Sequence, residues 1–177
     1  MQEQMEVSLK EMLDFREKKV RLVENLRNEF ADCILVSLGL NIPGPGKNNE
    51  EIFSVFMGAE KSLNKLLTEK KYKINKETII SEKAGNIAVF SLKTKAAEEV
   101  KAGLIDLEEG SGIGRLYDID VYRPDGFQVS RSDIGKEERK CLICGKSAKV
   151  CGRSREHSVE ELVKRTKEII SESLLCI

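Results

Sequence analysis

Two aspartates placed two positions apart are the clearest chemical signal in the chain. Asp118 and Asp120 lie in the segment Leu116-Tyr117-Asp118-Ile119-Asp120-Val121, whose β-forming residues predict a strand. Because strand side chains alternate between faces, both carboxylates should project the same way. Like charges on one face need a cation or an arginine beside them, and such oxygen ligands suit Mg²⁺. The alternative is an edge strand whose polar face meets water.

A glycine-rich stretch precedes these aspartates. Gly110-Ser111-Gly112-Ile113-Gly114 could bring backbone N–H groups close to phosphate oxygens, which makes Ser111 a candidate substrate-binding residue, and Arg115 could add a bidentate contact. Followed by the aspartates, this stretch predicts phosphate binding beside a metal site, which phosphoryl or nucleotidyl transfer requires. On the glycines alone, a linker that ends a helix is the alternative.

A proline- and glycine-rich loop covers residues 41–48, Asn-Ile-Pro-Gly-Pro-Gly-Lys-Asn. Its prolines block helix and its glycines, among them Gly44, allow positive φ, so the loop could form a rigid wall. Lys47 could deliver an ammonium group to an anion, and Asn41 and Asn48 could pair with polar groups of a ligand. An ordinary strand-to-helix connector is the alternative.

A second basic stretch begins at Arg131 and continues to Arg139 and Lys140. These side chains could hold phosphate or the acidic surface of a partner protein. Surface ion pairs are the more common use of such charges and remain the alternative.

Four residues near the C-terminus form a candidate metal-ligand set. Cys141 and Cys144 have the CxxC spacing, and with Cys151 and His157 they offer three thiolates and one imidazole for a tetrahedral Zn²⁺. Free cysteines buried in a core are the alternative. A redox CxxC is less consistent with a sequence that lacks a thioredoxin-like context, and His157 is also a candidate general base.

The pattern of apolar residues predicts the elements that position these groups. Helical spacing is expected over residues 8–30, 50–67, 94–109 with Thr94 as the cap, and from Ser158, which forms a capping box with Glu161. In the first helix the predicted apolar stripe comprises Leu9, Met12, Leu13, Val20, Val23 and Leu26, and the charged face is expected to be solvated. Strands are expected over residues 33–38, 78–81, 87–92, 115–122 and 127–130, the later ones forming two hairpins.

The order of these elements predicts an α+β fold. We expect a single domain over residues 1–177, with a mixed sheet, flanking helices, a cysteine-rich segment at residues 141–157 and a terminal helix. The chain has 30 lysines and arginines against 30 aspartates and glutamates, so no net basic field favours nucleic acid. No run is apolar enough for a membrane span or a signal peptide, and five cysteines, including Cys33 and Cys176, argue against a secreted disulfide framework. A cytoplasmic protein is expected.

Four stretches together resemble the apo-citrate lyase phosphoribosyl-dephospho-CoA transferases, also called holo-citrate lyase synthases. They are residues 40–47, 114–121, 130–139 and 141–157, that is Leu-Asn-Ile-Pro-Gly-Pro with Lys47, Gly-Arg-Leu-Tyr-Asp-Ile-Asp-Val, Ser-Arg-Ser-Asp with Arg139, and Cys-Leu-Ile-Cys continuing through Cys151, Arg153, Ser154 and His157. Their order and spacing are similar to those of the family over almost the whole chain.

This resemblance implies a transferase of the nucleotidyltransferase type. The donor would be 2'-(5''-triphosphoribosyl)-3'-dephospho-CoA, made by another protein, and the acceptor a serine of the apo citrate lyase acyl carrier protein, the gamma subunit; pyrophosphate would leave. Asp118 and Asp120 would hold Mg²⁺, and Arg115, Lys47 and Arg131 would contact phosphates. The Asp-x-Asp pair also resembles that of nucleotidyltransferase folds, in which a glycine-serine turn precedes the strand; here Ser111-Gly112 has the reversed order.

Two other functions compete with this one. Within the enzymes, the same transfer to a malonate decarboxylase-type carrier uses similar donor chemistry. Outside them, a non-catalytic, zinc-stabilised binding module would present the cysteine segment as a surface and leave the aspartates facing water.

Overall fold

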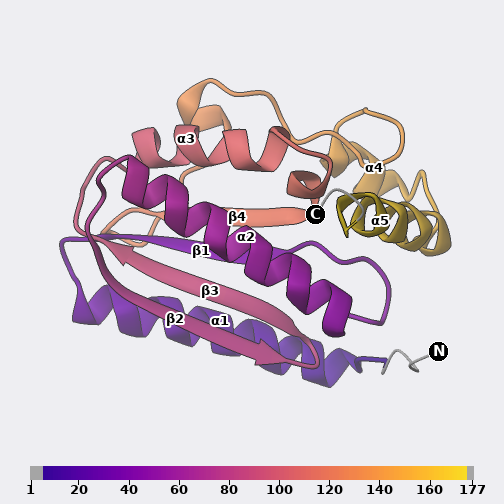
Figure 1. Cartoon of the computed structure of the whole chain (residues 1–177), viewed down its shortest axis with the longest axis horizontal. Helices are drawn as coiled ribbons and strands as arrows, with labels where there is room; N and C mark the ends of the chain where they lie inside the picture. Colours follow the sequence, from indigo (N-terminus) through magenta and orange to yellow (C-terminus); the bar gives the residue numbers. More distant parts are fainter. Residues whose placement is uncertain (1–5, 175–177) are drawn as a thin grey trace.

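The computed structural model describes residues 6–174 and contains helices on both faces of one four-stranded sheet (Figure 1). The elements, in chain order, are α1 (Leu9–Glu29), β1 (Ile34–Leu40), α2 (Glu50–Glu69), β2 (Ile74–Glu82), β3 (Gly85–Leu92), α3 (Ala97–Glu109), a 3₁₀ turn (Ile113–Leu116), β4 (Tyr117–Tyr122), a second 3₁₀ turn (Ser132–Ile134), α4 (Ala148–Ser154) and α5 (Val159–Leu174). The α+β class, the flanking helices and the terminal helix after the cysteine-rich segment are thereby confirmed.

The sheet has the strand order β2-β3-β1-β4, and each of these neighbouring pairs is antiparallel. The expectation of a mixed sheet is therefore wrong. The turn after Glu82 joins β2 to β3 as the predicted hairpin, whereas α3 carries the chain from β3 to β4 on the other side of β1. β3 and β4 run in the same direction, but β1 separates them, so no parallel pair forms.

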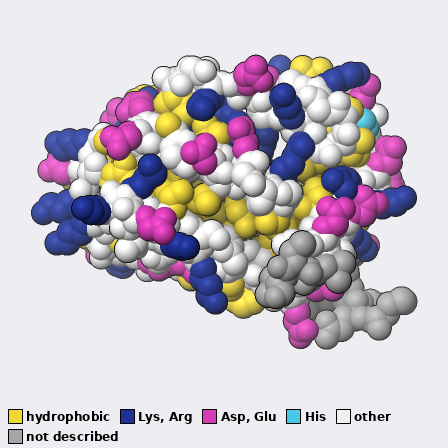
Figure 2. All heavy atoms as spheres, turned by 45° about the horizontal axis from the view of Figure 1, so that its top comes forward, with side chains coloured by type: hydrophobic (Ala, Val, Ile, Leu, Met, Phe, Trp, Pro, Cys, Tyr) yellow, Lys and Arg dark blue, Asp and Glu magenta, His cyan; other side chains and the backbone are white. Residues whose placement is uncertain are grey.

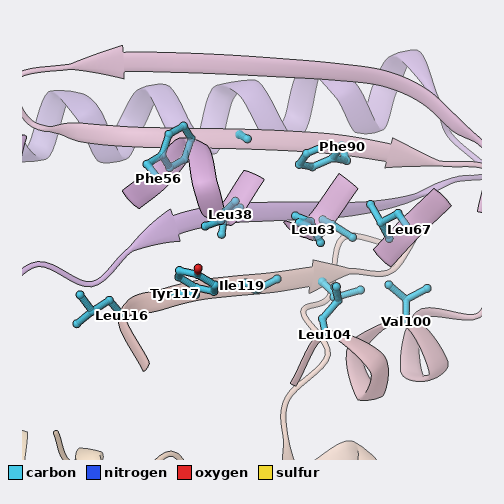
Figure 3. Close-up of a cluster of buried hydrophobic side chains, with 14 of the residues drawn as sticks. Leu38, Phe56, Leu63, Leu67, Phe90, Val100, Leu104, Leu116, Tyr117 and Ile119 are labelled. Atoms are coloured by element: carbon cyan, nitrogen blue, oxygen red, sulfur yellow. The ribbon is translucent and has the colours of Figure 1, made fainter. Parts of the chain in front are cut away.

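One face of the sheet carries the main core. Leu38, Phe90 and Ile119 point from three strands toward α2 and α3, where Phe56 and Leu104 meet them (Figure 3). All five side chains are at most 1% exposed, and burying each stabilises the fold by roughly 1.5–3 kcal/mol.

α1 covers the opposite face of the sheet (Figure 1). Leu35, Ile87 and Val89 form a smaller cluster there with Leu26 of the helix. Because alternate residues of β4 enter the main core, Asp118 and Asp120 must lie on this α1 side.

The apolar stripe predicted for α1 is wrong in part. Leu9, Leu13 and Val20 are exposed, and the side chains that pack inward are Phe15, Leu22, Val23 and Leu26. The inward face is thus rotated away from the predicted one, and it carries charged residues next to its apolar ones.

Other boundaries also differ from the prediction. Arg115 belongs to the 3₁₀ turn before β4, and residues 127–130 contribute only an isolated bridge between Tyr122 and Gln128 in place of a full strand. Thr94 accepts a hydrogen bond from Ala96 N–H, which precedes the helix, so it does not cap α3. By contrast, Ser158 and Glu161 form the predicted capping box at the start of α5.

Charges of both signs are interspersed over the face shown in Figure 2, with hydrophobic side chains between them. This agrees with a net charge of zero, and it means that an anion site depends on a local cluster. Within residues 6–174, no helix is long and apolar enough to cross a membrane. Cys176 lies outside the described residues.

Candidate active site

The two aspartates meet an ammonium group from α1. Lys19 Nζ lies 2.9 Å from Asp120 Oδ2, and the side-chain amide of Gln128 donates to Asp120 Oδ1. The Lys19 and Asp120 side chains are only 26% and 19% exposed, so solvent screens this pair less than a surface ion pair. Lys19 therefore supplies the positive charge that two carboxylates on one strand face require.

Asp118 is the more accessible member of the pair. Its side chain is 51% exposed, and Arg139 Nη1 lies 4.0 Å from its Oδ1. Partial burial of the carboxyl group and the neighbouring charge of Asp120 raise the pKa of Asp118, while Lys19 and Arg139 oppose that shift. Asp118 thus offers oxygen atoms to a ligand, whereas both oxygens of Asp120 already accept hydrogen bonds.

A cavity of about 260 Å³ opens between α1, β1 and the loop after it, with Asp118 in its wall. Three cationic side chains line it: Arg16 and Lys19 from α1, and Lys47 from the loop. Burial and the nearby Arg16 lower the pKa of Lys47, whose Nζ donates to Ile42 O at 2.5 Å. Such a cluster of cations beside one carboxylate is an environment for an anionic ligand.

The loop that carries Lys47 is tied to the β2–β3 hairpin. Asn48 Nδ2 donates to Glu82 O at 2.9 Å, and Asn86 Nδ2 donates back to Asn48 Oδ1 at 2.8 Å. Asn41 and Asn86 also line the cavity. Asn48 therefore positions the loop, while Asn41 is placed to contact a ligand.

Sequence reasoning missed Arg16 and Lys19, because the charged face of the first helix was expected to be solvated. A signal for Lys19 was available. It lies four residues after Phe15 and three before Leu22, which is an apolar position on the inward face of the helix. A lysine in such a position needs a buried or half-buried partner, which here is Asp120.

Arg115 lies outside this cavity and binds the cysteine segment. Its Nη2 donates to Lys140 O at 3.2 Å and to Cys141 O at 2.8 Å. Arg139 in turn donates to the carbonyl groups of Arg115 and Tyr117. Both arginines line a second cavity of about 610 Å³, which Asn41 also borders, so the two cavities adjoin at that residue.

Three other residues that the sequence predicted to bind the substrate, Ser111, Arg131 and Gly44, do not line the cavity that contains Asp118. Ser111 Oγ accepts from Gly114 N–H at 3.1 Å in the turn after α3, which favours the helix-ending alternative for the glycine stretch. Arg131 is bound to Glu108 and Glu109 at 2.5 Å each, and Gly44 packs against Val163 of α5.

The four C-terminal candidates come together as the sequence predicted. One ligand atom from each of Cys141, Cys144, Cys151 and His157 can be chosen so that all four lie within 4.8 Å of one another. This cluster could hold a metal ion such as zinc. Cys33, in contrast, lies apart and accepts a hydrogen bond from Asn75 at 3.2 Å.

Comparison with known proteins matches the sequence of this chain to one family. A family model described as apo-citrate lyase phosphoribosyl-dephospho-CoA transferase matches residues 7–173. A protein with the same description from Escherichia coli is 32% identical over 142 residues, which are 80% of this chain and 77% of that protein.

Two longer relatives, both named CitXG, also match. The one from Haemophilus influenzae is 32% identical over 163 residues, covering 92% of this chain and 35% of that protein. The one from Leuconostoc mesenteroides is 33% identical over 156 residues, covering 88% and 33%. This chain therefore spans about a third of the length of the two CitXG proteins.

Proposed function

The chain belongs to the apo-citrate lyase phosphoribosyl-dephospho-CoA transferase family, and on this premise we propose that it attaches a prosthetic group to a carrier protein. The donor is 2'-(5''-triphosphoribosyl)-3'-dephospho-CoA, and the acceptor is a serine of the apo citrate lyase acyl carrier protein, the gamma subunit. This makes the chain a nucleotidyltransferase in the broad sense, since a phosphodiester forms and pyrophosphate leaves.

The reaction sets the demands on the site. The serine oxygen attacks the phosphorus bound to the ribose, a new P–O bond forms, and the P–O bond to pyrophosphate breaks. The serine proton passes to a base, and negative charge grows on the leaving pyrophosphate. Catalysis of this kind depends on positioning and on positive charge near the phosphates.

The observation that carries the proposal is the cavity whose wall contains Arg16, Lys19 and Lys47 together with Asp118. The three cations would bind the phosphate oxygens, and Asn41 would bind a polar group of the donor where the second cavity begins. The second cavity, with Arg115 and Arg139 in its wall, is large enough to hold the remaining part of the long donor molecule.

Asp118 is the member of the aspartate pair that is placed to bind Mg²⁺. The half-exposed carboxylate of Asp118 is a hard oxygen ligand beside a phosphate-binding cavity, and Asp120 adds a second carboxylate on the same face. When bound there, Mg²⁺ would neutralise charge on the transferred phosphate and the leaving pyrophosphate. Asp120 meanwhile keeps Lys19 in place through its ion pair.

The decisive experiment incubates the protein with donor, Mg²⁺ and apo carrier, and weighs the carrier by mass spectrometry. Asp118→Asn should lower the rate by about 10²-fold or more with unchanged circular dichroism, because it removes an anionic oxygen ligand at constant volume. Asp125→Asn is the matched control, since Asp125 is exposed in the turn after β4 and its Oδ1 contact to Phe127 N–H can be kept by asparagine.

Three results of this assay would redirect the proposal. Full turnover of the Asp118→Asn variant would remove the carboxylate from the chemistry. Modification of a malonate decarboxylase-type carrier in place of the citrate lyase carrier would change the acceptor. Binding of carrier without any mass increase would favour the non-catalytic module.

A further inference from the structure

We infer that Cys141, Cys144, Cys151 and His157 form a closed, structural Zn²⁺ centre, which is separate from the proposed transfer chemistry. Their ligand atoms all lie within 4.8 Å of one another. Sulfur atoms on a tetrahedral Zn²⁺, each at about 2.3 Å from the metal, are roughly 3.8 Å apart. Cys144 Sγ and Cys151 Sγ are 3.4 Å apart as free thiols, close to that spacing and well beyond the length of a disulfide bond.

His157 provides a second, independent observation that points to a metal ligand. His157 Nε2 is buried and has no hydrogen-bond partner among the described residues. A buried polar nitrogen left without a partner costs about 1–3 kcal/mol. A bond from this nitrogen to a metal shared with the three sulfur atoms would remove that cost.

The backbone around the first two cysteines is shaped for thiolate ligands. Cys141 N–H donates to Lys146 O at 2.7 Å, and Gly145, directly after Cys144, has φ +71°, so the chain turns tightly around the pair. Ile143 N–H lies 3.5 Å from Cys141 Sγ and donates to it. Backbone N–H groups directed at sulfur are the second-shell contacts that orient a metal-bound thiolate.

Two further segments bring the other ligands. Cys151 is the buried residue of α4, and His157 precedes Ser158, the residue that caps α5. Four protein ligands fill a tetrahedral Zn²⁺ and leave no position for water, so this metal is structural. It would join the turn at Cys141 to α4 and to the start of α5.

The site also adjoins the proposed active site. Cys141 O accepts from Arg115, and Arg139, two residues before Cys141, forms the ion pair with Asp118. Loss of the metal should therefore loosen the C-terminal segment first, and disturb the cavity wall around Arg139 only as a consequence.

Metal analysis of protein purified without added metal tests the inference directly. We expect about one zinc per chain. Cys144→Ser should reduce bound zinc to near zero; because Cys144 is exposed, this change leaves no core cavity. Cys33→Ser is the matched control, since Cys33 is a buried free cysteine outside the cluster, and it should keep the full zinc content.

Cobalt substitution identifies the ligands without relying on activity. Co²⁺ in the parent protein should give the strong visible absorption of a tetrahedral site together with a thiolate-to-cobalt charge-transfer band. His157→Ala should lose the tetrahedral spectrum, whereas His157→Cys should keep it and strengthen the charge-transfer band. A parent protein that holds no zinc and gives only weak octahedral cobalt absorption would overturn the inference, as would equal zinc content in Cys33→Ser and Cys144→Ser.

Discussion

At the scale of single residues, Lys19 both forms an ion pair and lines the candidate active site. It neutralises Asp120 at 2.9 Å and lines the cavity beside Asp118. Lys19→Met should therefore destabilise the fold by about 1–3 kcal/mol, because Asp120 keeps its charge in a half-buried position without the ammonium partner. It should also weaken donor binding about tenfold, since one charge-assisted contact to phosphate is lost. Chemical denaturation and donor titration measure the two effects separately.

The neighbouring lysine provides the control for this prediction. Lys18 pairs with Glu82 at 2.6 Å, but their side chains are 51% and 38% exposed. Lys18→Met should change the stability by less than about 1 kcal/mol and leave donor binding unaltered. If the Lys18 and Lys19 variants behave alike, the role given to Lys19 is wrong.

The sequence could predict part of this site at the residue scale. Alternation along a strand placed Asp118 and Asp120 on one face, and ligand spacing brought Cys141 and His157 into one cluster. The spacing of Lys19 indicates that it shares a face with apolar residues of α1, but it could not show that this face meets Asp120, because the periodicity of a helix does not reveal which strand the face contacts. Arg131 is a second example. The sequence identified it as a basic residue that could bind a ligand, but it could not show that Glu108 lies beside it and forms an ion pair with it.

At the scale of elements, the loop after β1 packs closely against α5 at Gly44. Gly44 has φ +79°, and a Cβ added there would lie 2.7 Å from Val163 Cγ2. Gly44→Ala should thus destabilise the protein by about 2–3 kcal/mol, of which about 1–2 kcal/mol is the cost of positive φ and the rest is displacement of α5. It should also weaken donor binding, because Lys47 lies on the same loop.

Gly135→Ala separates the two contributions. Gly135 also has positive φ, +66°, but a Cβ there would meet nothing within 4 Å. Its variant should show only the conformational cost of about 1–2 kcal/mol and normal donor binding. Equal losses of stability in the two variants, measured by urea denaturation, would contradict the packing of this loop on α5.

The elements that sequence predicted well are those with their own local signals. α2 and α5 have long apolar stripes, and α5 has a capping box, so their start positions were correct to within a residue. Tertiary contacts decided the others. Arg115 lies in a 3₁₀ turn and its side chain binds the cysteine segment, a contact that local sequence does not reveal. α4 is a short helix whose single buried residue, Cys151, gives no periodicity to detect.

At the scale of the whole molecule, one face of the sheet forms the main core and the other face carries the proposed site. The face toward α2 and α3 is apolar and closely packed, which fixes β4 in place. The face under α1 carries a smaller cluster and, at the β4 edge, the charged groups of the proposed site. A chain without net charge can still bind an anionic donor, since the cations that matter are gathered at one end of this second face.

At the same scale, one acidic pair should make the stability of the protein fall as pH rises from 4.5 to about 7. Partial loss of hydration at the carboxyl group and, next, the neighbouring Glu60 raise the pKa of Glu77 from 4.5 to about 7. Between these values the native protein keeps a proton that the unfolded chain has released, so the free energy of unfolding decreases as pH rises through this window. The penalty is absent below pH 4.5 and complete above about pH 7.

Glu77→Gln should remove that penalty and raise the melting temperature at pH 8, with a gain that shrinks to nothing near pH 4.5. A fully buried group with this pKa would give about 3 kcal/mol, but Glu77 is exposed on β2, and solvent screening reduces the expected gain to about 1 kcal/mol. Glu69→Gln is the control for the loss of one carboxylate, because Glu69 lies at the exposed end of α2, where it pairs with Lys65, and is not part of the Glu60–Glu77 pair. Thermal unfolding of the parent and both variants across pH 4.5 to 8 makes the comparison, and a gain for Glu77→Gln that is the same at both ends would show that its carboxyl group titrates normally in the native protein.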